Sequence, residues 1–193
     1  MKLDTLQALY IDELKDLYSA ESQILKALPK MIRAAEHPEL KNAFTDHMKQ
    51  TENQVKRLDK IFESLEESPK GKKCHGMEGV LEEGAELIKE KPEQDVLDAG
   101  LISAAQHVEH YEMAGYGTVR TWAEKLGRDE DARLLQDTLD EERAADELLT
   151  SLALQSINID ADREVGLPTE SETRTSPRVK PRPGKPAQPS ANR

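Results

Sequence analysis

Hydrophobic residues recur at three- and four-residue steps along most of the chain up to about residue 160. This spacing places them on one face of an α-helix, whereas a half-buried strand alternates hydrophobic and polar residues. Four such stripes can be followed, over residues 6–32, 44–62, 97–119 and 134–152. No stretch of useful length alternates, so the sequence predicts an all-α protein with four long helices.

Prolines and glycines predict where these helices begin and end. Pro38 suits the first turn of the second helix, Pro92 begins the third, and Gly127 is a natural stop at its end. Pro29 is expected to kink or break the first helix, because it lacks a backbone N–H. Each long helix then has about 25–35 residues, and a rise of about 1.5 Å per residue makes it roughly 40–50 Å long.

The links between the helices predict their topology. Short links join the first helix to the second and the third to the fourth, and short links make antiparallel neighbours. Residues 66–92 lie between the second and third helices and include a weaker helical segment at 77–89. Two antiparallel hairpins joined by a long crossover containing a short helix form the topology of a ferritin-like four-helix bundle. A simple up-down bundle with a decorated loop is the alternative.

Composition narrows the class of protein. Charged residues make up 34% of the chain, aromatic residues 4%, and the formal net charge is −11. The chain has no run of about 18 apolar residues, and acids stand in the N-terminal segment where a signal peptide has an apolar core. We therefore expect a cytoplasmic protein that does not span a membrane. The single cysteine, Cys74, excludes an internal disulfide framework and a zinc site of several cysteines.

The last part of the chain differs from the rest. From residue 171 onward it has six basic residues, one acid, five prolines and no aromatic residue, so its net charge is +5. Such a segment buries too little apolar surface to fold. We expect a folded unit over residues 1–160 and a disordered, basic, Pro-rich tail over residues 161–193. The acidic folded unit argues against nucleic-acid binding apart from weak contact by the tail, and a plain solubilising tail is the alternative.

Acidic residues interrupt the hydrophobic stripe of every long helix near its middle. The inward positions are occupied by Glu21, Glu52, Glu109, Glu112, Glu142 and Asp146. Burying an ionised carboxylate without a partner is costly, and several at one level of a helical bundle would repel one another. Two divalent cations would compensate them, because carboxylates chelate and bridge metal pairs about 3.5–4 Å apart. Oxygen ligands suit iron and manganese, and also magnesium and calcium.

Four segments resemble one known family, in order and at the family's spacing. They are residues 18–23 (YSAESQ), 74–83 (CHGMEGVLEE), 106–114 (QHVEHYEMA) and 138–142 (TLDEE). The sequence resembles the YciF-type ferritin-like proteins, a bacterial, stress-associated family long classed as a domain of unknown function. The resemblance covers about residues 3–158. It implies a ferritin-like four-helix bundle, close to rubrerythrin in shape and packed as a homodimer, with a dinuclear metal site. It implies no established reaction.

The wider ferritin-like pattern has one Glu on each of two helices and Glu-x-x-His on each of the other two. By resemblance, Glu21 fits the single Glu of the first helix. Glu109 and Glu112 are similar to the paired glutamates of the third helix in rubrerythrin, and Glu142 fits the Glu of the fourth-helix motif.

Neither Glu-x-x-His motif is intact, however. Ala145 stands where the fourth helix would carry His, and Asp146 follows it. In the second helix Glu52 takes the position of the His, while His47 lies on the same helix and is a substitute nitrogen ligand. The expected site is therefore richer in carboxylates than the standard one, and an incomplete or single-metal site stays open.

Three functions follow as expectations. The first is a stress-response protein with a dinuclear iron or manganese site, which oxidises ferrous iron or consumes peroxide. The second is a non-catalytic dimeric scaffold or interaction protein without a working metal site, since some of the 38 acids must reach stripe edges by chance. A large iron-storing cage is a third reading, although nothing in the sequence specifies cage contacts. Whether the chain is an enzyme stays open between them.

Overall fold

The computed structural model describes residues 2–163, all of whose regular elements are helices. These are α1 (Leu6–Ala34), α2 (Pro38–Ser64), α3 (His75–Glu90), α4 (Gln94–Lys125), α5 (Asp129–Leu152), the π-helical turn η1 (Ala153–Ile157) and α6 (Asn158–Ala161). This part of the chain contains no strand, so the all-α prediction is confirmed. None of its helices is long and apolar enough to cross a membrane. Most of the predicted tail, from residue 164 onward, lies outside the described residues.

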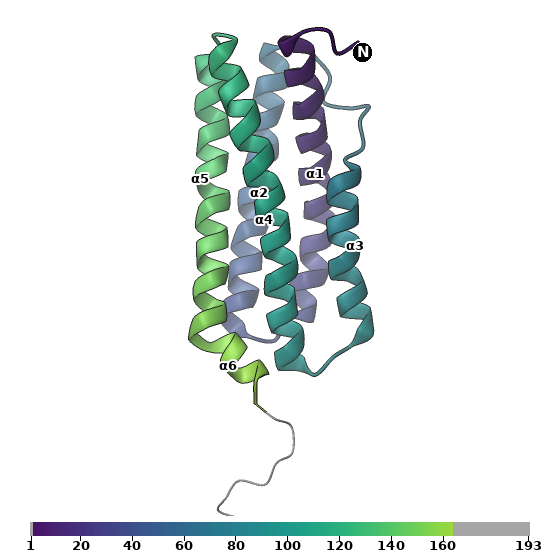
Figure 1. The fold of residues 1–193 in the computed structure, drawn as a ribbon, viewed down its shortest axis with the longest axis vertical. Helices are drawn as coiled ribbons and strands as arrows, with labels where there is room; N and C mark the ends of the chain where they lie inside the picture. The colour runs from purple at the N-terminus through teal and green to yellow at the C-terminus, as the bar shows by residue number, and fades with distance from the viewer. Residues whose placement is uncertain (1, 164–193) are drawn as a thin grey trace, which may run out of the picture. The chain divides into compact units, whose positions relative to one another are not determined.

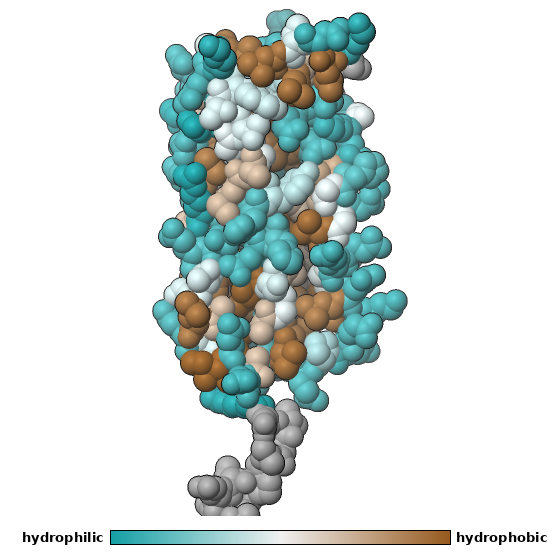
Figure 2. Space-filling model, viewed as in Figure 1, coloured by the Kyte–Doolittle hydropathy of each residue, from teal (hydrophilic) through white to brown (hydrophobic). Residues whose placement is uncertain are grey.

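The four longest helices run alongside one another (Figure 1). Short connections turn α1 back into α2 at one end, and α4 back into α5 at the other end. The longer connection from α2 to α4 contains α3, which packs beside α1 and α4. The face shown in Figure 2 is mostly hydrophilic, with scattered hydrophobic residues that include a group toward its lower end.

The helix ends follow from local chemistry. The Thr5 side chain accepts a hydrogen bond from the Ala8 N–H and so caps α1. Pro38 occupies the first turn of α2, where its missing N–H removes no helical hydrogen bond. Gly127 follows the last turn of α4 with a φ of +71°, a left-handed conformation that favours glycine.

Of the two effects predicted for Pro29, the break is wrong, because α1 continues to Ala34, and the kink stays a prediction. A proline inside a helix removes one backbone donor but does not prevent the turns on either side from packing. Leu28 and Met31, which flank it, are both buried and fix the last turns of α1 against the other helices.

The interior is divided into two hydrophobic clusters. Along α1, Leu14 and Leu17 belong to one cluster, Ile24 and Leu28 belong to the other, and the fully buried Glu21 lies between them. The other long helices repeat this order, and their intervening buried polar residues are His47, Thr51 and Gln54 on α2, Glu109 and Glu112 on α4, and Glu142 on α5. The chain therefore buries one polar layer between two hydrophobic clusters.

Candidate metal centre

Four buried side chains of the polar layer converge on one point. They are His47 from α2, Glu109 and Glu112 from α4, and Glu142 from α5, and one ligand atom from each lies within 4.8 Å of the others. Glu109 and Glu112 share a face of α4 because residues three apart are neighbours on a helix. The His47 Nε2 lies 3.5 Å from the Glu109 Oε1. This buried His/Glu cluster has the composition and spacing of a group that can hold a metal ion.

A fifth acid lies beside these four. Glu21 of α1 is fully buried, and its Oε1 accepts a hydrogen bond from the Tyr116 hydroxyl of α4. The charge of Glu21 raises the pKa values of Glu109 and Glu112, and the charge of Glu142 raises the pKa of Glu21. The polar layer thus holds four carboxyl groups and one imidazole in electrostatic contact.

Burial raises the pKa of every carboxyl group in the layer. The loss of water around Glu21, reinforced by the nearby Glu142 charge, raises the pKa of Glu21 to about 8. Burial likewise raises the pKa of Glu109 to about 7, and it lifts the pKa values of Glu112 and Glu142 well above the ordinary value for glutamate. Without a cation, the layer therefore retains protons at a pH where exposed carboxyl groups are ionised.

Many of the ligand atoms have no hydrogen-bond partner within residues 2–163. They are Glu21 Oε2, Glu109 Oε2, both carboxylate oxygens of Glu112, Glu142 Oε2 and both ring nitrogens of His47. Buried polar atoms are normally paired, because leaving one unpaired costs free energy. A coordinated cation would satisfy these atoms together. One imidazole nitrogen with several carboxylate oxygens is a ligand set that suits iron or manganese, so the residues present fit such an ion.

A hydrogen-bonded group on α2 holds one of the ligands in place. The Gln54 amide donates to Glu142 Oε1 and, at 3.1 Å, to the Oε2 of the adjacent Glu141. Arg57 in turn makes a two-pronged contact with Glu141, at 2.7 and 2.6 Å. Partners of this kind orient metal ligands and tune their basicity. The sequence analysis did not predict a role for Gln54, although its position seven residues after His47 places it on the same helix face.

The expectation that Glu52 faces inward is wrong, because its side chain is exposed. The prediction placed Glu52 inside because it lies between Met48 and Val55 of the hydrophobic stripe, but both of these residues are only partly buried. Phe44, Leu58 and Phe62 of the predicted stripe are buried. In the middle of α2, however, the buried residues are His47, Thr51 and Gln54, each one position before the predicted Met48, Glu52 and Val55.

Asp146 is also outside the four-residue cluster. Its side chain is 21% exposed and lies 3.3 Å from the His110 Nε2. It also accepts a hydrogen bond from the Gln106 amide at 3.0 Å, so it links α5 to α4 near the surface. The structure therefore brings together Glu21, His47, Glu109, Glu112 and Glu142 among the predicted ligands, but neither Glu52 nor Asp146.

A groove between α2 and α5 leads to the cluster. It has a volume of about 310 Å³, and its lining includes His47 and Glu109 as well as Ala144 and Ala145. Ala145 stands where the ferritin-like pattern would place a histidine. Its small side chain leaves space on this side of the ligands.

The comparisons with known proteins agree with the resemblance. A family model described as a domain of unknown function, DUF892, matches residues 5–162. The chain belongs to this family. Protein YciF of Escherichia coli (strain K12) is 45% identical over 165 residues, which are 85% of this chain and 99% of that protein. The predicted relationship to YciF-type proteins is confirmed.

Solved structures of similar chains share the fold. The crystal structure of the E. coli stress protein YciF has a TM-score of 0.78 and 44% identity, over 81% of this chain and 99% of its own. A structure named YcfI, from Rhodopseudomonas palustris, has a TM-score of 0.75 and 42% identity, over 78% and 98% of the two chains. A Xanthomonas campestris protein, at 21% identity and a TM-score of 0.66, shows a similar fold alone.

Proposed function

We propose that the chain is a ferritin-like four-helix bundle that binds iron or manganese in its polar layer and acts in the response to stress. His47, Glu109, Glu112 and Glu142 would hold one ion, and Glu21 beside them would be a ligand for a second. The observation that carries the proposal is the set of buried, unpaired ligand atoms at this one level of the interior. The stress role is transferred from the similar YciF, which is described as a stress protein.

The bound ions would supply one-electron redox chemistry, so that ferrous iron is oxidised or peroxide is consumed. The protein's own contribution is to position ligands and to hold protons. The Tyr116 hydroxyl orients Glu21, and the Gln54 amide orients Glu142. Because burial raises the pKa of Glu109 to about 7 in the metal-free protein, metal binding near neutral pH would release a proton from this group.

A non-catalytic homodimer is the second function that we keep, because hydrophobic side chains remain exposed on the described part of the chain. The exposed fractions are 46% for Val96, 48% for Leu148, 70% for Leu154 and 56% for Ile159. Exposed hydrophobic residues can contribute to a protein interface where they form a contiguous patch. Under this alternative the buried acids stay protonated and bind no metal.

The deciding experiment is metal content per chain, measured by mass spectrometry after anaerobic loading with Fe(II) or Mn(II) and removal of free ions. We expect about two tightly held ions for a dinuclear site. The Glu109→Gln/Glu112→Gln double variant should lose them, because amides are poor ligands. Glu52→Gln is the matched control, since Glu52 is an exposed acid and its loss should leave the metal content unchanged. Folded wild-type protein with only traces of metal would support the scaffold instead.

A further inference from the structure

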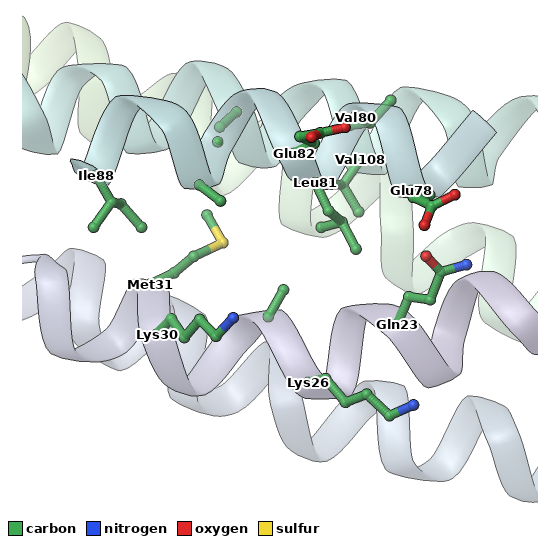
Figure 3. A pocket seen from close by; sticks show the side chains of 14 residues that line it. Gln23, Lys26, Lys30, Met31, Glu78, Val80, Leu81, Glu82, Ile88 and Val108 are labelled. Carbon is green, nitrogen blue, oxygen red and sulfur yellow. The ribbon is translucent and has the colours of Figure 1, made fainter. Parts of the chain in front are cut away.

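A second groove lies on another side of the helical body, between α1, α3 and α4 (Figure 3). It has a volume of about 400 Å³. Figure 3 shows Gln23 and Glu78 pointing toward one another at one end of it, while Met31, Leu81 and Val108 lie further along its walls. Polar side chains thus lie at one end of the groove, and apolar side chains lie further along it.

A small inner pocket adjoins this groove. Its volume is about 20 Å³, and it shares Ala27, Met31, Leu81 and Val108 with the groove. Its remaining apolar lining consists of Ile24, Leu28, Phe44 and Ala105. The two polar residues in its wall are His47 and Glu109, which are both members of the His/Glu cluster. The inner pocket thus lies between the groove and the His/Glu cluster and shares lining residues with both.

The size and lining of the pocket limit what can occupy it. A cavity needs roughly 10–15 Å³ to hold one water molecule, so this pocket has room for a molecule of one or two heavy atoms. Eight of its ten lining residues are apolar, so ions or hydrogen peroxide would lose most of their hydrogen bonds along this pocket. Dioxygen is small, uncharged and apolar, and it needs no such partner.

We propose that the path through Ala27, Met31, Leu81 and Val108 brings dioxygen to the His47–Glu109 side of the metal cluster, which makes dioxygen the oxidant of this centre. The inference rests on the proposed function. In the reaction, two ferrous ions each give one electron to one dioxygen molecule. The reduced dioxygen takes up two protons and leaves as hydrogen peroxide, and two ferric ions remain.

Two substitutions of alanine by leucine provide the first test. Ala27 lines both the groove and the inner pocket, whereas Ala85 lines the groove alone. In protein loaded anaerobically with Fe(II), Ala27→Leu should slow oxidation by dioxygen roughly tenfold, because overpacking adds a barrier to a narrow passage. Ala85→Leu should oxidise at the wild-type rate. Both variants should bind the wild-type amount of Fe(II) and should react with hydrogen peroxide as the wild type does.

Xenon binding to metal-free protein gives a readout that does not depend on iron. Apolar cavities stay dry and bind xenon. We expect a xenon site at the inner pocket, by crystallography under xenon pressure, in the wild type and in Ala85→Leu but not in Ala27→Leu. If the wild type binds no iron, the proposed metal function fails, while the xenon measurement still decides whether the pocket accepts a small apolar molecule.

The opposite results would overturn the inference. It is wrong if xenon does not bind in the wild type, or if Ala27→Leu and Ala85→Leu react equally fast with dioxygen. It is also wrong if narrowing the α2–α5 groove by Ala145→Leu slows dioxygen, since the oxidant then arrives from that side. If Ala27→Leu does not fold, Leu81→Ala widens the same junction and should increase xenon occupancy relative to the wild type.

Discussion

The hydroxyl of Tyr116 on α4 donates a hydrogen bond to the carboxylate of Glu21 on α1, in the interior where neither side chain is exposed to solvent. The bond joins residues that are 95 positions apart in the sequence. It lowers the pKa of Glu21, while burial and the Glu142 charge raise it. Tyr116 therefore makes it easier for Glu21 to lose its proton and to become a metal ligand.

The Tyr116→Phe substitution should weaken metal binding at neutral pH. Without the hydroxyl, the pKa of Glu21 rises further, so a metal ion must displace a proton that is held more tightly. Loss of a partner around a ligand typically lowers metal affinity about 10–100-fold. Mn(II) titrations at several pH values should show the midpoint of binding moved to higher pH.

Tyr18→Phe is the control, because the Tyr18 ring packs edge-on against Phe62 at a centroid distance of 6.0 Å. Equal Mn(II) affinity in the wild type and Tyr116→Phe would contradict this account.

The metal-free protein should become less stable as the pH rises. In an unfolded chain a glutamate titrates near about 4.3, whereas burial raises the pKa of Glu21 to about 8 in the folded protein. Between these values the folded state binds more protons than the unfolded state, so the free energy of unfolding falls with increasing pH. Urea unfolding with a chelator present should therefore give a lower midpoint at about pH 8.5 than at about pH 5.5.

Metal should reverse this trend, because it binds the deprotonated ligands. With Mn(II) in excess, the urea midpoint at the higher pH should exceed that of the metal-free protein. The Glu109→Gln/Glu112→Gln double variant supplies the control, since amides do not titrate and its stability should vary less with pH. The same pH dependence in this variant as in the wild type would show that Glu109 and Glu112 do not contribute to it.

The inner positions on α1 and α4 could be read from the sequence because hydrophobic residues bracket the acids closely. Leu17 and Ile24 flank Glu21, and Val108 and Tyr116 flank the α4 pair, so the helical period alone places these acids inside. The all-α class follows from the same signal. The identity of the metal cannot be predicted from the sequence, because iron and manganese accept the same ligand types.

The inner face of α2 could not be read in the same way. Three of its buried residues in the middle of the helix, His47, Thr51 and Gln54, are polar, so they weaken the hydrophobic stripe that would reveal it. Met48 and Val55 are partly buried and lie one position after His47 and Gln54, so the hydrophobic pattern pointed to Glu52 instead of Thr51 as an inner residue. On α5 the helical period correctly predicts that Glu142 is buried. Asp146, four residues later, was also predicted to face inward, but it lies near the surface beside His110 of α4. Hydrophobic periodicity thus fails where the buried surface is itself polar.

Asp98 has a structural role that is separate from the metal centre. This buried carboxylate on α4 accepts hydrogen bonds from the backbone N–H groups of Glu36 and His37, at 3.0 and 2.7 Å, in the α1–α2 connection. Asp98→Ala should lower the free energy of unfolding by about 2–3 kcal/mol, because it leaves both donors without their charged partner. The metal content of the folded fraction should stay the same. Asp95→Ala, at an exposed position on the same helix, should have little effect on the urea midpoint.

Restoring the missing histidine on α5 should strengthen the centre. Ala145 lines the groove that reaches His47 and Glu109, and it lies three residues after Glu142, so Ala145→His completes a Glu-x-x-His pair on that helix. A second imidazole should raise Fe(II) affinity by roughly tenfold, which corresponds to about 1.4 kcal/mol. Competition with a coloured chelator measures this change. Ala144→His places the same side chain in the same groove but about 100° away around the helix, and its affinity should remain that of the wild type. If both variants gained affinity equally, the added histidine would be binding iron in the groove rather than at the His/Glu cluster.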